Sequence, residues 1–209
     1  MKIYVTGAYG PSQEFEALRE AGHEVVLGRP VDQPGRQPYT QEELVEWCRD
    51  ADVIMATHME TISRPVLEAS ERLRCVVVPY IGADKIDVPA ATELGIVVAN
   101  SPTSQNFLGV AEATIGLMLM LFKRIKHNEA KLRRGEWAQR VDRGWLLSGK
   151  TIGFVGLGRV GTQVARRLQG WEARLLACDP YIPPENARPL GVTLVTLSAL
   201  LAESDVVSL

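Results

Sequence analysis

Short apolar segments alternate with amphipathic segments through the first hundred residues of the chain. The apolar segments are four to six residues long and rich in β-branched side chains, which favours buried strands. The segments between them have the spacing of helices with one apolar face. Strands are predicted at residues 2–6, 24–27, 52–56, 74–79 and 96–99. This repetition of strand, helix and strand is typical of an α/β fold with a parallel sheet.

Helix starts in the same region are marked by residues that cap helices. Ser12 is a candidate N-cap, and Thr40 followed by Glu43 has the spacing of a capping box. Asp87 is placed to cap a short helix before the last strand. Residues 28–38 are rich in glycine and proline, so we expect a surface loop or linker there.

A long apolar helix is predicted at about residues 107–126, between two regions of α/β pattern. Because apolar residues surround most of it, we expect it to be buried by more than one neighbour at a domain junction. Residues 128–148 are polar but include Trp137 and Trp145. These tryptophans either form a contact surface or pack beneath their own loop, and the pattern leaves both alternatives open.

A second strand–helix–strand pattern contains the most specific motif of the chain. A short apolar strand at residues 152–155 is followed by Gly156, Gly158 and Gly161 at G-x-G-x-x-G spacing. In a dinucleotide site the first glycine allows a tight turn and the second lets the backbone approach a diphosphate. The third lets the following helix pack closely on the strand.

The residues after the glycines complete this motif. The helix starts at Arg159 and Val160, and N–H groups at a helix start favour a diphosphate. Asp179 follows the next strand, 18 residues after Gly161, near the position of the acid that binds the adenosine ribose. A carboxylate there repels a 2′-phosphate, so the motif predicts NAD rather than NADP. A Rossmann domain that has lost its ligand, or that binds another adenosine compound, is the alternative.

Composition narrows the class of protein. The chain has 209 residues, 46% hydrophobic content and a formal charge of −2, which does not indicate a nucleic-acid partner. The apolar run at 115–122 is shorter than the roughly 20 residues that cross a bilayer. The first residues, MKIYVTG, match a strand and lack a signal peptide's apolar core, so we expect a cytoplasmic protein without a membrane partner. The odd number of cysteines, three, predicts reduced packing residues, and no metal motif is evident.

Three segments together resemble the D-isomer-specific 2-hydroxyacid dehydrogenases, a family that includes phosphoglycerate, glyoxylate and formate dehydrogenases. They are IGADKIDVPAATELGIVVANSP at 81–102, NFLGVAEATIGLMLML at 106–121, and GKTIGFVGLGRVG with CDPY at 149–181. The resemblance implies a flavodoxin-like substrate domain at residues 1–100. Residues 101–209 would then be the first half of a doubly wound Rossmann NAD-binding domain that includes the long helix.

The resemblance also implies substrate contacts. In such enzymes backbone N–H groups hold the substrate carboxylate, and the matching residues are Ile81 and Gly82. Many members have an arginine and a serine where this chain has His58 and Met59, which leaves the particular substrate open. Asn106 matches an asparagine that helps to hold the substrate in formate enzymes, although a helix N-terminal role is an equal alternative.

The family's activity is NAD-dependent oxidation of the alcohol carbon of a D-2-hydroxy acid, or reduction of the 2-oxo acid. The reaction needs a general acid/base, a carboxylate and a cation, which in the family are a histidine, a glutamate and an arginine of the C-terminal half. We expect these after Leu209, so the chain alone is expected to be a fragment without its catalytic residues. His23 and His127 have ordinary structural interpretations, and His58 is a weak candidate base. A non-catalytic NAD-binding or sensing module is the alternative.

The resemblance implies assembly as well. Family members commonly form homodimers through the cofactor domain, with the helix and the following arm at the contact. Trp137 and Trp145 are therefore candidates for a dimer interface.

Overall fold

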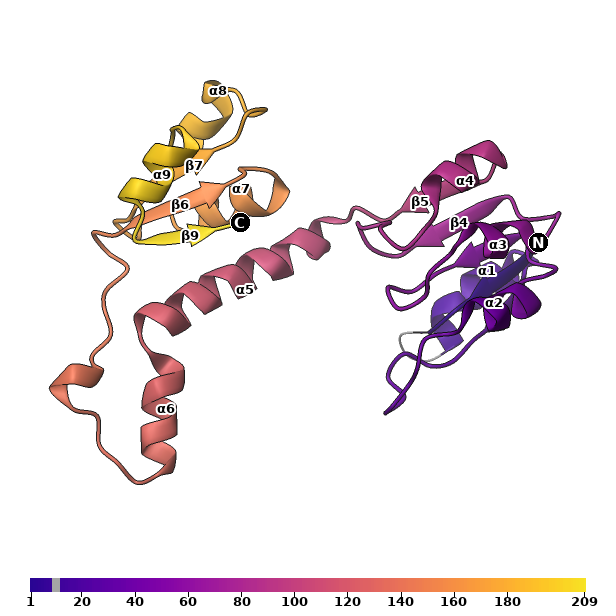
Figure 1. Cartoon of the computed structure of the whole chain (residues 1–209), viewed down its shortest axis with the longest axis horizontal. Coiled ribbons are helices and arrows are strands. Elements are labelled where there is room, and N and C mark those ends of the chain that lie inside the picture. Colours follow the sequence, from indigo (N-terminus) through magenta and orange to yellow (C-terminus); the bar gives the residue numbers. More distant parts are fainter. Residues whose placement is uncertain (9–11) are drawn as a thin grey trace. The chain divides into compact units, whose positions relative to one another are not determined.

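A computed structural model describes residues 1–8 and 12–209 of the chain. It divides into two compact units, Met1–Thr103 and Ser104–Leu209, and each has a parallel sheet of its own (Figure 1). The predicted α/β fold is confirmed.

All three cysteines are free, and burial raises the pKa of the Cys48 thiol to about 12.

The first unit has a five-stranded parallel sheet of order β2-β1-β3-β4-β5. This is the flavodoxin-like order. Its strands are β1 (Lys2–Val5), β2 (Glu24–Leu27), β3 (Val53–Met55), β4 (Cys75–Val78) and β5 (Val97–Asn100). All five lie within two residues of the predicted bounds, because each is a short apolar run between polar turns.

Helices on both faces cover this sheet. They are a 3-10 turn at Ser12–Phe15, α1 (Glu16–Glu20), α2 (Gln41–Trp47), α3 (Arg64–Glu68) and α4 (Val88–Glu93). The predicted capping box is present: the Thr40 hydroxyl accepts from the Glu43 N–H at 3.2 Å, and the Glu43 carboxylate accepts from the Thr40 N–H at 2.9 Å. Asp87 accepts from the Ala90 N–H at 3.0 Å. The predicted Ser12 cap concerns a side chain outside the described residues.

Two layers of apolar side chains form the core of the first unit. Successive residues of a strand point to opposite faces, so Ile3 and Val5 pack with Phe15 on one face. Tyr4 packs with Ile54 and other buried residues on the other face. Burial on both faces holds the ends of the strands, and the loops that follow them, in fixed positions.

The second unit has a four-stranded parallel sheet of order β8-β7-β6-β9. This matches the 3-2-1-4 start of a doubly wound domain. Its elements are β6 (Thr151–Val155), α7 (Arg159–Arg167), β7 (Arg174–Cys178), α8 (Pro184–Ala187), a 3-10 turn at Arg188–Leu190, β8 (Val192–Leu194), α9 (Leu197–Glu203) and β9 (Val206–Ser208). The strand β8 is only three residues long and was not predicted from the apolar pattern.

The predicted long helix is two helices, α5 (Ser104–Phe122) and α6 (Ile125–Arg133), separated by Arg124 with a left-handed φ of 53°. Helix α5 packs on α7 through buried Ala111 and Met118, whereas Leu117 and Leu121 are 60% and 69% exposed. Within the second unit α5 is therefore covered on its α7 side, and burial by a further neighbour at a domain junction stays a prediction. By length and composition α5 is the one helix of the described residues that passes as a membrane span, a property that helices packed in soluble proteins share.

The chain then forms an arm, residues 134–148, which includes a 3-10 turn at Arg140–Asp142. Trp137 is 80% exposed and Trp145 is 59% exposed. Of the two alternatives for these tryptophans, packing beneath their own loop is wrong.

Candidate functional site

The glycine turn after β6 has three distinct geometric requirements. Gly156 has a φ of 97°, which favours glycine, and its N–H donates to the Cys178 carbonyl at 2.9 Å. A Cβ on Gly161 would lie 2.7 Å from the Gly156 carbonyl oxygen, so only glycine permits this close packing. A Cβ on Gly158 would meet no atom within 4 Å. The turn therefore packs tightly against other protein atoms at Gly161, whereas it leaves open space beside Gly158.

Helix α7 begins at Arg159, directly after this open position. Gly158 is its N-cap and has no side chain to accept from the first N–H groups. The N–H groups at Arg159 and Val160 have no intrahelical acceptor, because the first turn of any helix lacks one. An open backbone approach beside free helix N–H groups fits the diphosphate of a dinucleotide.

Asp179 is hydrogen-bonded to the same turn. Its Oδ2 accepts from the Leu157 N–H at 2.7 Å, and its Oδ1 accepts from the N–H groups of Tyr181 at 2.8 Å and Ile182 at 3.2 Å. These donors stabilise the charged form and lower the pKa of the carboxyl group, led by the Leu157 N–H. The sequence predicted Asp179 as the ribose-binding acid, and that role stays a prediction; its hydrogen bond to the glycine turn was missed.

A pocket of about 270 Å³ lies in the first unit, at the carboxyl ends of β3 and β4. Its lining combines apolar side chains from the strand ends with polar residues from the loops that follow. The lining residues are Ala56, Thr57, His58, Glu60, Val78, Tyr80, Gly82, Ala83, Asp84, Lys85 and Ile86.

The turn of Ile81 and Gly82 borders this pocket. The Asn100 side-chain amide donates to the Ile81 carbonyl at 2.8 Å and so fixes the turn from behind. Within the described part of the chain, the N–H groups of Ile81 and Gly82 have no hydrogen-bond acceptor. A Cβ on Gly82 would lie 2.8 Å from an Asp84 carboxylate oxygen. Two neighbouring N–H groups without an acceptor have the chemistry that suits an anion.

The other predicted substrate residues do not all lie in the pocket. His58 lines it, and its ring lies edge-on to the Tyr80 ring with 6.3 Å between centroids. Met59 points elsewhere: its sulfur accepts from the Arg36 guanidinium at 2.7 Å. Asn106 belongs to the second unit, in the first turn of α5. The structure therefore brings together His58 and Gly82 as lining residues, with Ile81 beside them.

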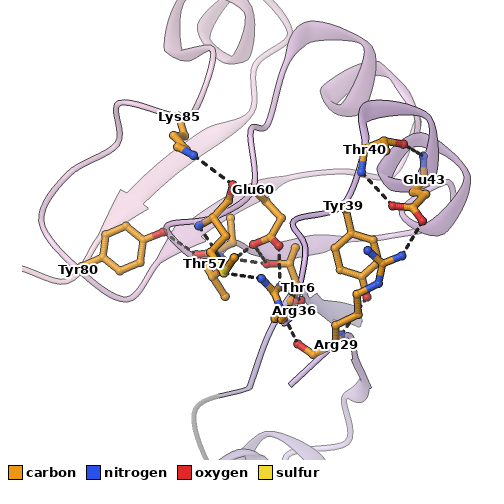
Figure 2. Close-up of polar contacts among 12 residues, drawn as sticks. Thr6, Arg29, Arg36, Tyr39, Thr40, Glu43, Thr57, Glu60, Tyr80 and Lys85 are labelled. Carbon is orange, nitrogen blue, oxygen red and sulfur yellow. Dashed lines mark hydrogen bonds and ion pairs between the residues drawn. The ribbon is translucent and has the colours of Figure 1, made fainter. Parts of the chain in front are cut away.

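Sequence reasoning missed a buried ion pair next to the pocket. Arg36 and Glu60 have side chains only 2% and 0% exposed, with 2.6 Å between the guanidinium and the carboxylate (Figure 2). Residues 28–38 were expected to be a surface loop, and this expectation is wrong for Arg36. The one signal in the sequence was the position of Glu60, between a strand end and the apolar Ile62.

Comparison with known proteins identifies the family. Residues 115–209 match the model of the D-isomer specific 2-hydroxyacid dehydrogenase NAD binding domain, and these residues include the glycine turn and Asp179. The chain belongs to this family. Residues 115–209 of the second unit thus form an NAD-binding domain of the type found in D-isomer specific 2-hydroxyacid dehydrogenases, and NAD is its cofactor.

Relatives extend the similarity to the first unit. A D-3-phosphoglycerate dehydrogenase of Methanocaldococcus jannaschii is 42% identical over 171 residues, which cover 81% of this chain and 32% of that protein. A D-3-phosphoglycerate dehydrogenase of Rattus norvegicus is 32% identical over 207 residues, 99% of this chain and 37% of that protein. The chain spans about a third of the length of these curated relatives.

Solved structures of related dehydrogenases have a similar fold. The D-lactate dehydrogenase of Escherichia coli has a TM-score of 0.75 at 29% identity, covering 99% of this chain and 64% of that chain. The NAD-dependent formate dehydrogenase of Staphylococcus aureus, in complex with NAD, has a TM-score of 0.80 at 26% identity, with 99% and 64% covered. The 2-hydroxyacid dehydrogenase fold thus includes both units.

The second unit contains a histidine and carboxylate pair. His127 Nε2 lies 2.6 Å from an Asp142 oxygen, and Lys131 donates to the other oxygen at 2.6 Å. The Gln139 N–H also donates to Asp142 at 2.7 Å. These contacts hold the pKa of Asp142 far below its ordinary value, led by Lys131 and then His127, and they fasten the arm to α6. The pair is a structural clasp that the sequence did not reveal.

The remaining histidine also has a structural position. His23 precedes β2, and its Nδ1 is buried without a hydrogen-bond partner in the structure. Among the described residues, no group of three or more histidine, cysteine or acidic side chains is placed to hold a metal ion.

Proposed function

We propose that this chain forms the substrate-binding and cofactor-binding parts of an NAD-dependent oxidoreductase that acts on the CH–OH group of a D-2-hydroxy acid. In the reverse direction it would reduce the 2-oxo acid. The observation that carries the proposal is the pair of Ile81 and Gly82 N–H groups without acceptors, at the border of a pocket, in a chain that also has the family's dinucleotide turn.

In this proposal the substrate carboxylate accepts from the N–H groups of Ile81 and Gly82. His58 lines the same pocket and contacts the rest of the substrate, where many family members have arginine. Met59 supports the loop from behind because its sulfur is paired with Arg36. Asn106 is proposed as a further substrate contact from the start of α5.

The cofactor residues have separate tasks. The diphosphate lies over Gly158 and accepts from the N–H groups at Arg159 and Val160, while Gly156 and Gly161 shape the turn. Asp179 binds the adenosine ribose hydroxyls with the lone pairs that its backbone contacts leave free. When bound, NAD supplies the nicotinamide ring that exchanges a hydride with the alcohol carbon.

We further propose that the 209-residue chain does not turn over substrate by itself. The Glu60 carboxylate in the pocket wall is engaged by Arg36 and Thr6, so it is not free to orient a base. His23 is absent from the pocket lining, and His127 is paired with Asp142. The general acid/base, its carboxylate and the cation are therefore proposed to come from residues other than these.

The test is to purify residues 1–209, titrate NAD, and follow NADH absorbance with D-lactate, D-glycerate and D-3-phosphoglycerate. NAD binding without turnover is the expected result. Robust turnover would contradict the inactivity of the chain alone. If NAD binds but the complete gene product also gives no activity, an NAD-sensing module is the better interpretation. Failure to bind NAD would contradict the proposal itself.

Assembly is the last part of the proposal. The exposed apolar residues of α5 and the arm favour a homodimer through the cofactor domain, with Leu117, Leu121, Trp137 and Trp145 at the contact.

A cytoplasmic location is proposed together with the soluble dehydrogenase function, and cell fractionation would test it.

A further inference from the structure

The sheet order of the first unit defines where a ligand is usually found. In open α/β sheets, ligands bind outside the carboxyl ends of the strands, at the point where the strand order reverses. In the order β2-β1-β3-β4-β5 this point lies between β1 and β3. Thr6 follows β1 directly, and Thr57 lies two residues after β3. The switch-point crevice therefore lies between Thr6 and Thr57.

This crevice is filled by the protein's own loop. A Cβ on Gly7 would lie 2.7 Å from Val31 Cγ2 and 2.9 Å from Thr57 Cγ2, so even a methyl group has no room there. Arg36 enters from the same loop, and its guanidinium donates to the carbonyls of Thr6 at 3.1 Å and Arg29 at 3.2 Å. The ordinary ligand position is thus occupied by a side chain of the chain itself.

Glu60 completes the closure of the crevice between Thr6 and Thr57 (Figure 2). Its Oε1 accepts from Arg36 at 2.6 Å, and its Oε2 accepts from the Thr6 hydroxyl at 3.0 Å and from the Thr57 hydroxyl. One buried carboxylate therefore joins the end of β1, the loop that carries Arg36 and the loop after β3.

Glu60 and Thr57 also line the pocket next to this crevice. The opposite wall of that pocket is tied to the same loop, because the Ile62 N–H donates to the Lys85 carbonyl at 2.8 Å and the Lys85 ammonium donates to the Met59 carbonyl at 3.1 Å. The crevice and the pocket therefore share one wall, formed by residues 57–60.

We propose that Arg36 and Glu60 are positioning residues for the substrate. Their ion pair closes the β1–β3 crevice, so the substrate binds in the β3–β4 pocket instead. This inference rests on the proposed function, in which the pocket receives an anionic 2-oxo or 2-hydroxy acid. Arg36 neutralises the carboxylate in the pocket wall and fixes residues 57–60 from behind. Without Arg36, the wall would place an unpaired negative charge beside the substrate carboxylate.

The test compares a charged with an uncharged probe on the full chain. Backbone amide NMR shifts of Ile81 and Gly82 are followed during titration with pyruvate and with its neutral amide, pyruvamide. Arg36→Met is expected to weaken pyruvate binding about tenfold or more while it changes pyruvamide binding much less. The double variant Arg36→Met with Glu60→Gln removes both charges and is expected to restore most of the pyruvate affinity.

Controls separate charge from loss of fold. Arg72→Met removes an exposed ion pair with Asp52 in the same unit and should leave both probes unaffected. Rescue by the double variant excludes simple unfolding, since an unfolded chain would not regain affinity when a second residue is changed. Equal loss of both probes without rescue would overturn the inference, as would unchanged pyruvate affinity in Arg36→Met. If pyruvate moved neither amide in the unaltered chain, the proposed substrate pocket itself would fail.

Discussion

The Asp179 carboxylate shapes the cofactor turn and is also the proposed ribose-binding acid. It accepts from three backbone N–H groups that shape the cofactor turn, and it is the acid that the family fingerprint places at the ribose. A change at this residue should therefore alter the turn before any ligand is present. A role in cofactor choice alone would leave the ligand-free protein unchanged.

The pH dependence of stability tests this residue. The folded pKa of Asp179 is below its ordinary value of 3.8, so its contribution is complete above the unfolded pKa and is lost as the pH falls through the folded one. The ligand-free melting temperature should fall from pH 5 toward pH 3, and Asp179→Asn should lack part of this fall. Parallel curves for the two proteins would contradict the prediction.

Some residues of the candidate sites could be predicted from the sequence, and others could not. Gly156, Gly158 and Gly161 could be predicted because their tasks are set by spacing within one turn. The partnership of Arg36 with Glu60 joins loops 24 residues apart, and no local periodicity encodes it. Glycine-rich loops are ordinarily exposed, so the buried guanidinium depends on tertiary packing.

At the level of elements, the turn between β6 and α7 has two glycines in different surroundings. One packs closely against protein atoms, and the other has none beside it. Gly161 faces the Gly156 carbonyl, and Gly158 faces no atom within 4 Å. Close packing therefore requires glycine at Gly161, whereas the proposed requirement at Gly158 is the approach of the ligand.

Alanine at each position gives a matched pair of variants. Gly161→Ala should lower the free energy of unfolding by about 1–3 kcal/mol, because its Cβ overlaps a backbone oxygen. Gly158→Ala should change the melting temperature little but weaken NAD about tenfold, since its Cβ occupies the approach to the diphosphate. Thermal unfolding and NAD titration measure both. The prediction fails if Gly158→Ala binds NAD normally.

The end of α5 shows why an element boundary could not be predicted. The helix was predicted to continue to about Lys126, yet it stops at Phe122. The Trp145 N–H donates to the Phe122 carbonyl at 2.7 Å, and a Cβ on Gly144 would lie 2.6 Å from Lys123 Cα. The returning arm thus replaces the next helical turn, and this contact depends on a residue more than 20 positions away.

At the scale of the whole chain, each unit has its own buried core. The first unit is built on two apolar layers around its sheet, and the second on one cluster that joins α5, α7 and the β6–β8 strands. The two sheet orders could be anticipated from the family resemblance, since the alternating pattern indicates parallel strands but does not give their order.

Cofactor binding should therefore stabilise one unit selectively. With NAD at 100 times its dissociation constant, the second unit should gain about 2.7 kcal/mol, which corresponds to roughly 10 °C or more in melting temperature. Amide hydrogen exchange should slow in residues 151–182. The first unit serves as the internal control, and equal protection there would contradict the prediction.

The proposed dimer is tested at the same scale. Leu121→Glu places a charge on the exposed apolar face of α5 and should shift the chain toward monomer in sedimentation velocity. Leu201→Glu is the control, because Leu201 is similarly exposed on α9, outside the proposed contact. A monomeric unaltered chain would remove the basis for the proposal.

The separate cores have a practical consequence for protein engineering. Because the division falls between Thr103 and Ser104, a chimaera joined at this point would exchange a complete sheet without cutting either hydrophobic cluster. A donor chain could then supply a different coenzyme preference while residues 1–103 retain their own choice of acid. Recombination between related genes at this boundary would produce the same modular variation in nature.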